Sequence, residues 1–338
     1  MKNVLLLFGG ESSEHEVSIA SAKNVAKAIA SSKYATQYVY IDKQGTWWLV
    51  GEVSGDIGPD AQRIVLDLDA KTITAGDLLL TPDVVFPCLH GKNGEDGVIQ
   101  RLVQTLGVAI VGCGVTASEV CIDKVASKRI AEANGIAIVP YAVYEKGQPE
   151  PTYDALALQL SASLFVKPSR AGSSVGAHKV GNQQELADAL ADALLHDDVV
   201  LIEASVDPRE LEVAVLGVGD SAKASPVGEI IPEGEFYSYE SKYDPASTSS
   251  AVIPADISGE LSDSIREKAL VVYRALGCEG LSRVDFFVDK NSGELYFNEI
   301  NTMPGFTNIS MYPKLWEQVG VSNEQLMDEL LTIALTRN

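Results

Sequence analysis

Near the start of the chain the hydrophobic period changes once, and this change limits the folds that are possible. Residues 3–8 are apolar and β-prone, and after a Gly-Gly turn the residues Ile19, Ala22 and Val25 recur at helical spacing. Strands that alternate with helices predict an α/β fold with a parallel sheet, whose ligands bind beyond the carboxyl ends of the strands. In this first part we expect further strands at 37–40, 47–50, 84–89 and 109–111, and a helix at 98–106.

Two breaks divide the chain into three predicted domains. Gly112-Cys113-Gly114 interrupts the pattern, and a second break falls near residues 206–209. We therefore expect domains at 1–112, 113–207 and 208–338. In the last two domains we expect helices at 118–134, 183–195 and from Leu261 to Gly277. A last helix should begin at Ser322, where Ser-Asn-Glu-Gln has the form of a capping box. We expect strands at 164–167, 177–180, 199–203, 211–218, 283–288 and 294–300, and a connector at 144–153.

The charge of the chain excludes one class of partner. Lys and Arg number 26 against 47 Asp and Glu, which gives a net charge of −21 and should repel nucleic acid. No apolar run approaches the roughly 20 residues that cross a bilayer, so we expect no membrane segment. The cysteines, Cys88, Cys113, Cys121 and Cys278, have no metal-ligand spacing, and we interpret them as reduced, buried thiols of a cytoplasmic protein.

A cluster of polar residues lies on the last predicted hairpin. Side chains alternate along a strand, so Glu299 and Asn301 share a face, as do Arg283 and Asp285 on the partner strand. Two carboxylates and an amide oxygen form a ligand set that suits Mg²⁺. The alternative is a solvated hairpin face, but the flanking apolar residues predict a largely buried sheet, in which unpaired carboxylates would be costly.

A second candidate is the loop from Lys167 to Gly176. Gly172 and Gly176 let the backbone approach a ligand closely, and the loop's N–H groups, together with Ser173 and Ser174, could surround phosphate oxygens. The loop lies between two predicted strands and lacks the Gly-Lys-Ser/Thr of a P-loop, so an ordinary hairpin turn is the alternative.

Other candidates are weaker when taken alone. Glu203 ends a strand near a domain boundary, and with Glu210 it could accept hydrogen bonds from ribose, or both could be surface charges. Lys124 on its predicted helix could equally be solvated. The loops at 9–16 and 90–97 follow strands and should lie beside the ligand. Within them we interpret His15 and His90 as orienting or buried histidines.

Taken in order, these segments resemble the D-alanine–D-alanine ligases of the ATP-grasp superfamily. The resemblance runs over essentially the whole chain. It rests on the motifs Gly-Gly-Glu-Ser-Ser-Glu-His-Glu-Val-Ser, His-Gly-Lys-Asn-Gly-Glu-Asp-Gly, Val-Lys-Pro-Ser-Arg-Ala-Gly-Ser-Ser-Val-Gly, Phe-Tyr-Ser-Tyr-Glu-Ser-Lys-Tyr, Arg-Val-Asp-Phe-Phe and Asn-Glu-Ile-Asn-Thr-Met-Pro-Gly-Phe-Thr.

The resemblance implies a three-domain ATP-grasp architecture: an N-terminal substrate-binding α/β domain followed by central and C-terminal subdomains that clasp ATP. It implies that ATP phosphorylates one D-alanine, whose acyl phosphate is attacked by the amine of a second. Two Mg²⁺ ions, or Mn²⁺, would bind Asp285, Glu299 and Asn301. The nucleotide would contact Lys124, Lys167, Ser173, Ser174, Glu203, Ala204, Val206 and Glu210.

The resemblance also implies roles on the substrate side. Glu14 would hold the first ammonium group, in a network with Ser173 and Tyr243. Arg283 and the N–H of Gly305 would stabilise the oxyanion of the second step. The remaining substrate contacts would come from His90, Lys242, Ser310 and Met311, and residues 229–250 would form a lid that excludes water.

Several alternatives remain open at this point. Tyr243 and the apolar Met311 favour D-alanine as the second substrate, whereas relatives of the vancomycin-resistance type use D-serine or D-lactate. A nucleotide-binding protein without catalysis and a different carboxylate–amine ligase are the two other hypotheses. The family resemblance further implies a homodimer.

Overall fold

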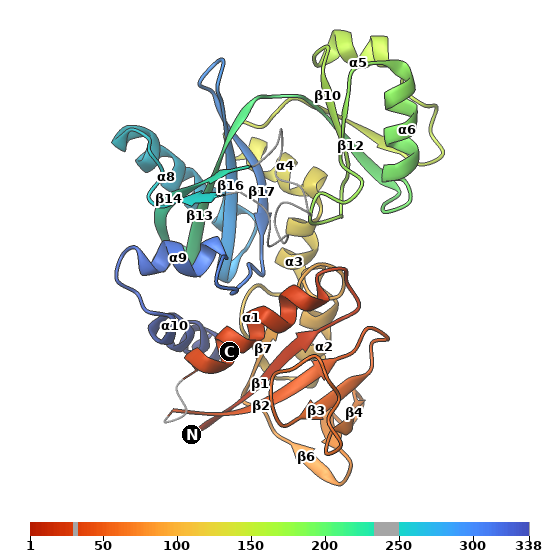
Figure 1. Cartoon of the computed structure of the whole chain (residues 1–338). Coiled ribbons are helices and arrows are strands. Elements are labelled where there is room, and N and C mark those ends of the chain that lie inside the picture. Colours follow the sequence, from red (N-terminus) through yellow and green to blue (C-terminus); the bar gives the residue numbers. More distant parts are fainter. Residues whose placement is uncertain (30–32, 233–249, 338) are drawn as a thin grey trace.

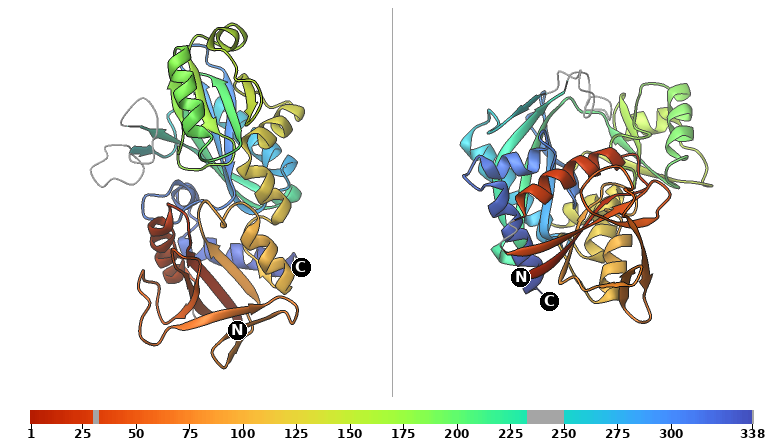
Figure 2. Two further views of the ribbon diagram at one scale, coloured as in Figure 1. Left: turned by 90° about the vertical axis from the view of Figure 1, so that its right-hand side faces the viewer. Right: turned by 60° about the horizontal axis from the view of Figure 1, so that its bottom comes forward.

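The computed structural model describes residues 1–29, 33–232 and 250–337, and these build three sheets. Figure 1 shows the N-terminal sheet in the lower body, the central sheet at the upper right and the C-terminal sheet at the upper left. Figure 2 shows the same three bodies from two further directions. The observed architecture agrees with the predicted α/β class. No helix in these three ranges is long and apolar enough to cross a membrane.

The N-terminal sheet is parallel at its centre, as predicted. Strand β1 pairs in parallel with β2 and β7, and β7 with β8. Val4, Leu6 and Phe8 of β1 belong to one apolar cluster, and Leu5 and Leu7 belong to another on the opposite face of the sheet. Because both faces are buried, the sequence of this strand is continuously apolar. The strand predicted at 47–50 is present as β3, but its antiparallel pairing with β2 and the further strands β4 to β6 were not predicted. The strands are β1 (Lys2–Gly9), β2 (Tyr34–Ile41), β3 (Trp47–Val50), β4 (Gln62–Asp67), β5 (Thr72–Ala75), β6 (Leu78–Leu80), β7 (Val84–Cys88) and β8 (Ala109–Ile110).

Two helices cover this sheet, one on each face. Helix α1 (His15–Ala28) buries Ile19, Ala22 and Val25, the stripe expected from the sequence. Helix α2 (Val98–Leu106) buries its own apolar stripe in the second layer.

The predicted helix at 118–134 is wrong as a single element. The chain forms α3 (Val115–Ile122) and α4 (Lys124–Ala133), separated by Asp123 with φ −84° and ψ 100°. The carboxylate of Asp123 accepts hydrogen bonds from the N–H groups of Val125 and Ala126, at 3.1 and 3.0 Å. This residue therefore caps a new helix, which periodicity alone does not reveal because the apolar spacing continues across the break.

The central sheet contains the predicted hairpin of β10 and β11. The predicted connector at 144–153 is wrong at both ends, because β9 extends to Glu145 and a helix begins at Tyr153. The elements are β9 (Tyr141–Glu145), α5 (Tyr153–Gln159), β10 (Leu164–Pro168), β11 (His178–Val180), α6 (Gln183–Ala193) and β12 (Val199–Ala204).

The C-terminal sheet is antiparallel, and its β16–β17 hairpin is confirmed. The predicted lid at 229–250 is corrected at both ends, since Glu229 belongs to β14 and Ser250 to β15. Residues 233–249 lie outside the described residues. The capping box predicted at Ser322 is present. The elements are β13 (Pro208–Val218), η1 (Gly219–Ser221), β14 (Lys223–Ile231), β15 (Ser250–Val252), α8 (Gly259–Ala275), β16 (Glu279–Asp289), β17 (Leu295–Asn301), α9 (Met311–Glu317) and α10 (Asn323–Thr336).

The last helices join the two ends of the chain. Leu326 and Leu330 of α10 belong to the same apolar cluster as Ile19 and Val25 of α1. Figure 1 shows α10 beside α1. The four cysteines are free and buried, as predicted.

A buried tyrosine gives a test of this packing. The hydroxyl of Tyr312 on α9 donates a 3.0 Å hydrogen bond to the carbonyl of Val215 on β13. We expect Tyr312→Phe to lower the free energy of unfolding by about 1–2 kcal/mol in urea, because the carbonyl loses a buried partner. The half-buried Tyr296→Phe is the control and should change it by less than about 0.5 kcal/mol. Equal effects of the two variants would contradict this account.

Candidate active site

Two adjoining cavities lie where the three bodies meet. The first lies between the N-terminal and C-terminal bodies, and the second between the central and C-terminal sheets. The residues that line both are Lys124, Ser173, Glu212, Arg283 and Glu299.

The predicted polar cluster of the last hairpin stands between the cavities. Arg283 pairs with Asn301 and Asp285 with Glu299 across β16 and β17, so the four side chains share one face as expected. Arg283 donates to both oxygens of Asp285, at 2.8 and 2.6 Å. Its Nε also lies 3.2 Å from Glu212 on β13, directly opposite Asp285. Burial opposes the positive charge, but Asp285 and Glu212 raise the pKa of Arg283 well above its usual value.

The donor chemistry of this cluster fits a hard divalent cation. Asp285, Glu299 and Glu212 all raise the pKa of Arg283, so one guanidinium faces three carboxylates. Lys124 compensates Glu299 at 3.2 Å. Within the described ranges no group of three His, Cys, Asp or Glu side chains is arranged to hold a metal alone. Two carboxylates and an amide match an ion that takes its remaining ligands from phosphate and water.

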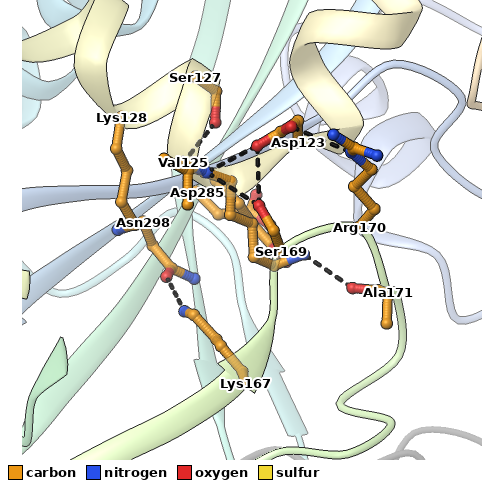
Figure 3. Close-up of polar contacts among 12 residues, drawn as sticks. Asp123, Val125, Ser127, Lys128, Lys167, Ser169, Arg170, Ala171, Asp285 and Asn298 are labelled. Atoms are coloured by element: carbon orange, nitrogen blue, oxygen red, sulfur yellow. Dashed lines mark hydrogen bonds and ion pairs between the residues drawn. The ribbon is translucent and has the colours of Figure 1, made fainter. Parts of the chain in front are cut away.

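Two members of a buried lysine–carboxylate–lysine group, Lys167 and Glu203, line the second cavity. Glu203 lies 2.7 Å from Lys167 and 2.8 Å from Lys128, which is fully buried. Burial works against the charge of Glu203, but the two lysines lower its pKa to about 2. Lys167 also donates to Asn298 at 3.4 Å, and Figure 3 shows this contact. Lys128 was not predicted, although its position four residues after Lys124 places both on one helical face.

The loop after Lys167 runs between the cavities. Ser173 and Ser174 have positive φ values, 53° and 57°, which turn the backbone sharply. Lys124 donates to the carbonyl of Ala171 at 2.8 Å. Figure 3 shows Ser169 and Arg170 both directed toward Asp123, which accepts from their side chains at 2.7 and 3.0 Å. The break between α3 and α4 thus anchors the loop.

The first cavity contains most of the residues expected on the substrate side. Glu14 is the N-cap residue of α1, and its Oε1 accepts from the hydroxyl of Ser173 at 2.7 Å. His15 is buried and contacts Gly10 and Tyr40, which confirms its interpretation as a buried histidine. The other predicted residues that line this cavity are His90, Gly305, Ser310 and Met311.

The second cavity gathers the remaining predicted nucleotide residues. Ser174, Ala204, Val206 and Glu210 all line it. Lys242 and Tyr243 lie outside the described residues.

Glu95 also lines the first cavity, and no role was predicted for it. It is 8% exposed, and one oxygen accepts from the N–H of Gly91 at 2.8 Å. Burial, reinforced by the charge of Glu14, raises the pKa of Glu95 to about 8. Its position, an acidic residue in a glycine-rich loop after a strand, could have identified Glu95 as a site residue from the sequence. Glu212 could have been identified in the same way, because it lies two residues after Glu210 in a strand and so on the same face.

Comparison with known proteins gives consistent matches over the chain. The family model for the D-ala D-ala ligase N-terminus matches residues 3–113, and that for the D-ala D-ala ligase C-terminus matches residues 130–332. The D-alanine–D-alanine ligase of Chlorobium luteolum is 44% identical over 98% of this chain and 96% of its own. The D-alanine–D-alanine ligase of Acetivibrio thermocellus is 43% identical over 99% of this chain and 96% of its own.

Solved structures match equally well. The D-alanine–D-alanine ligase from Coxiella burnetii has a TM-score of 0.87 and 34% identity, covering 100% of this chain and 96% of that one. The VanG D-Ala:D-Ser ligase from Enterococcus faecalis has a TM-score of 0.89 and 34% identity, covering 98% and 99%.

The raised pKa of Glu95 predicts a pH dependence of stability. The folded protein holds a proton on Glu95 up to about pH 8, whereas the unfolded chain releases it near 4.5. Stability should therefore fall as pH rises between these values, by at most about 1.4 kcal/mol per pH unit. In buffer free of metal and nucleotide, Glu95→Gln should lose this decline in urea unfolding, whereas the exposed Glu150→Gln should keep it. Parallel pH profiles for Glu95→Gln and the unmodified protein would refute the assignment.

Proposed function

Because the chain belongs to the D-alanine–D-alanine ligase family, we infer that it is an ATP-dependent enzyme that joins two D-alanine molecules into a dipeptide. The observation that carries this inference is the match of both family models, together with relatives of the same name over nearly the full length. ADP and inorganic phosphate are the other products, and the dipeptide supplies peptidoglycan synthesis.

The two cavities divide the substrates between them. We assign ATP to the second, between the domains at 113–207 and 208–338, and the amino acids to the first, beside the domain at 1–112. Lys124 and Lys167 would bind phosphate oxygens, with the loop of Ser173 and Ser174 close by. The base and ribose would lie along Glu203, Ala204, Val206 and Glu210, which line the same cavity.

In the first step, a carboxylate oxygen of the first D-alanine attacks the γ-phosphorus of ATP, and the bond to the bridging oxygen of ADP breaks. Glu14 would hold the ammonium of this D-alanine, and its contact with Ser173 connects that site to the phosphate loop. The step requires mainly positioning and neutralisation of charge. Asp285, Glu299 and Asn301 would hold two Mg²⁺ ions, or Mn²⁺, which supply positive charge to the phosphates.

In the second step, the amine of the second D-alanine attacks the carbonyl carbon of the acyl phosphate, and phosphate leaves. Arg283 and the N–H of Gly305 would stabilise the oxyanion, a position consistent with their place on the wall of the first cavity. Ser310 would bind the carboxylate of this D-alanine, together with Lys242.

A D-serine-using ligase is the second candidate because one similar structure has that activity. The described residues favour D-alanine. Met311 lines the first cavity and is 4% exposed, and a thioether offers little to a substrate hydroxyl. We also propose that the enzyme works in the cytoplasm, consistent with its free cysteines, and as a homodimer, as the resemblance implies.

The product identifies the activity directly. With Mg·ATP and D-alanine, the enzyme should release one phosphate per D-alanyl-D-alanine, measured by phosphate assay and mass spectrometry. D-serine or D-lactate added with D-alanine should yield only minor mixed products, and L-alanine none. A dominant mixed product would favour the second candidate, and no turnover with any D-amino acid would refute the ligase assignment.

The metal requirement forms a separate prediction. Chelation should abolish activity, and Mg²⁺ or Mn²⁺ should restore it. Glu299→Gln should lower kcat by about 100-fold or more and raise the Mg²⁺ concentration needed, because a charged ligand is lost. The control is Glu294→Gln, an exposed carboxylate on the same hairpin, which should leave both unchanged. An unaltered Mg²⁺ dependence in Glu299→Gln would remove this residue from the metal site.

A further inference from the structure

Two side chains of the N-terminal body, His90 and Ser21, bind the short segment 303–306 after β17. The carbonyl of Met303 lies 3.0 Å from Nδ1 of His90. The N–H of Phe306 donates to Oγ of Ser21 at 3.1 Å, and Ser21 Oγ lies 3.2 Å from Nε2 of His90. Residues 303–306 are thereby closed into a ring of hydrogen bonds with a helix and a loop more than 200 positions away in sequence.

Hydrogen-bonding chemistry gives the directions within this ring. A carbonyl can only accept, so Nδ1 of His90 carries a proton and donates it to Met303. Burial lowers the pKa of His90, which favours the neutral form of the ring. In that form Nε2 accepts from the hydroxyl of Ser21, which itself accepts from the N–H of Phe306. Each donor in the ring has one acceptor. Ser21 connects the hydrogen bond of His90 to Met303 with the hydrogen bond of Phe306.

Gly305 lies inside this ring. A Cβ at this position would be 2.7 Å from Ser310 Oγ and 3.8 Å from Ser21 Oγ, so the backbone passes close to both hydroxyls. Ser310 in turn contacts the N–H of Thr307 at 2.9 Å. The ring therefore holds the Gly305 backbone next to the residue assigned to the second substrate.

Asn24, one helical turn after Ser21, adds a second attachment. Its Nδ2 donates to the carbonyl of Phe306 at 2.8 Å and to Oδ1 of Asn308 at 2.9 Å. Residues three apart lie on the same face of a helix, so Ser21 and Asn24 form one contact surface on α1. The same helix begins beside Glu14, the residue assigned to the first substrate.

We propose that Ser21, with His90 and Asn24, is a positioning residue that sets the Gly305 N–H for the oxyanion of the second step and fixes the distance between the two D-alanine sites. This inference rests on the proposed function. None of the three residues needs to touch the reacting atoms, because each acts through the 303–308 backbone. Both ring nitrogens of His90 are engaged by protein groups, which makes it a member of this ring.

The test is Ser21→Ala in the full-length enzyme. Misplacing a donor by about 1 Å costs roughly 100-fold, so we expect dipeptide kcat to fall about 10- to 100-fold. The KM for ATP should stay within about twofold, because no nucleotide contact changes. Phosphate released per dipeptide should rise above one, since acyl phosphate that is not captured hydrolyses. Ser21→Thr keeps the hydroxyl and should recover most of the activity.

The matched control is Ser18→Ala. Ser18 is equally buried on α1, but its Oγ accepts from the N–H of Gly9 at 2.8 Å and donates to the carbonyl of Cys88, so its hydrogen bonds go to the N-terminal sheet. The Ser18→Ala variant should lower thermal stability as Ser21→Ala does, but it should leave the ratio of phosphate to dipeptide at one. If Ser21→Ala does not fold, the half-buried Asn24→Ala replaces it, with the same expected rise in the ratio.

Each outcome separates the hypotheses. An unchanged ratio and kcat in Ser21→Ala, or equal losses in Ser18→Ala, would overturn the positioning role while the ligase activity stands. If the unmodified enzyme makes no dipeptide, the proposed function fails and this inference fails with it.

Discussion

One buried guanidinium surrounded by carboxylates is the interaction on which the site depends. Glu212, Asp285 and Glu299 face one another on three neighbouring strands, an arrangement of like charges that destabilises a sheet. Arg283 lies two residues from Asp285 on the same face, contacts Asp285 and Glu212 and compensates their charge, so removing it would take a counter-charge away from buried carboxylates. Lys124 adds a second positive charge beside Glu299, and two cations do not balance three anions. The negative charge that remains supports the proposal that divalent cations, and through them phosphates, bind at this point of the sheet.

The same local balance explains how a chain of net charge −21 can bind an anionic nucleotide. Lys128 and Lys167 both contact Glu203, so this group carries a net positive charge. Because its members are at most 9% exposed, salt screens them less than it screens the acidic surface. Burial therefore allows a few cations to determine the electrostatic potential inside the cavity, while the surface of the protein stays negatively charged.

The sequence predicted features that depend on local pattern and missed those that depend on long-range contact. The face shared by Arg283, Asp285, Glu299 and Asn301 follows from strand alternation, and the Ser322 capping box from a four-residue motif. The break at Asp123 was missed because the apolar period continues across it. Lys128 and Ser21 were missed for a different reason: a buried lysine or serine on a helix has a function only through its partners, Glu203 and Phe306, which no spacing along the chain identifies.

Helix α1 shows why such long-range partners matter for the reaction. One face buries Ile19 and Val25 against the sheet and against Leu326 and Leu330 of α10, so the last helix fixes the position of the first. Its first turn adjoins Glu14, and its Ser21 and Asn24 hold the segment that contains Gly305. A rigid helix transmits any tilt to all three places at once. With the roles proposed for Glu14 and Gly305, the distance between the bound ammonium group and the oxyanion donor depends on the core packing that holds α1 in place as well as on the polar contacts of Ser21 and Asn24.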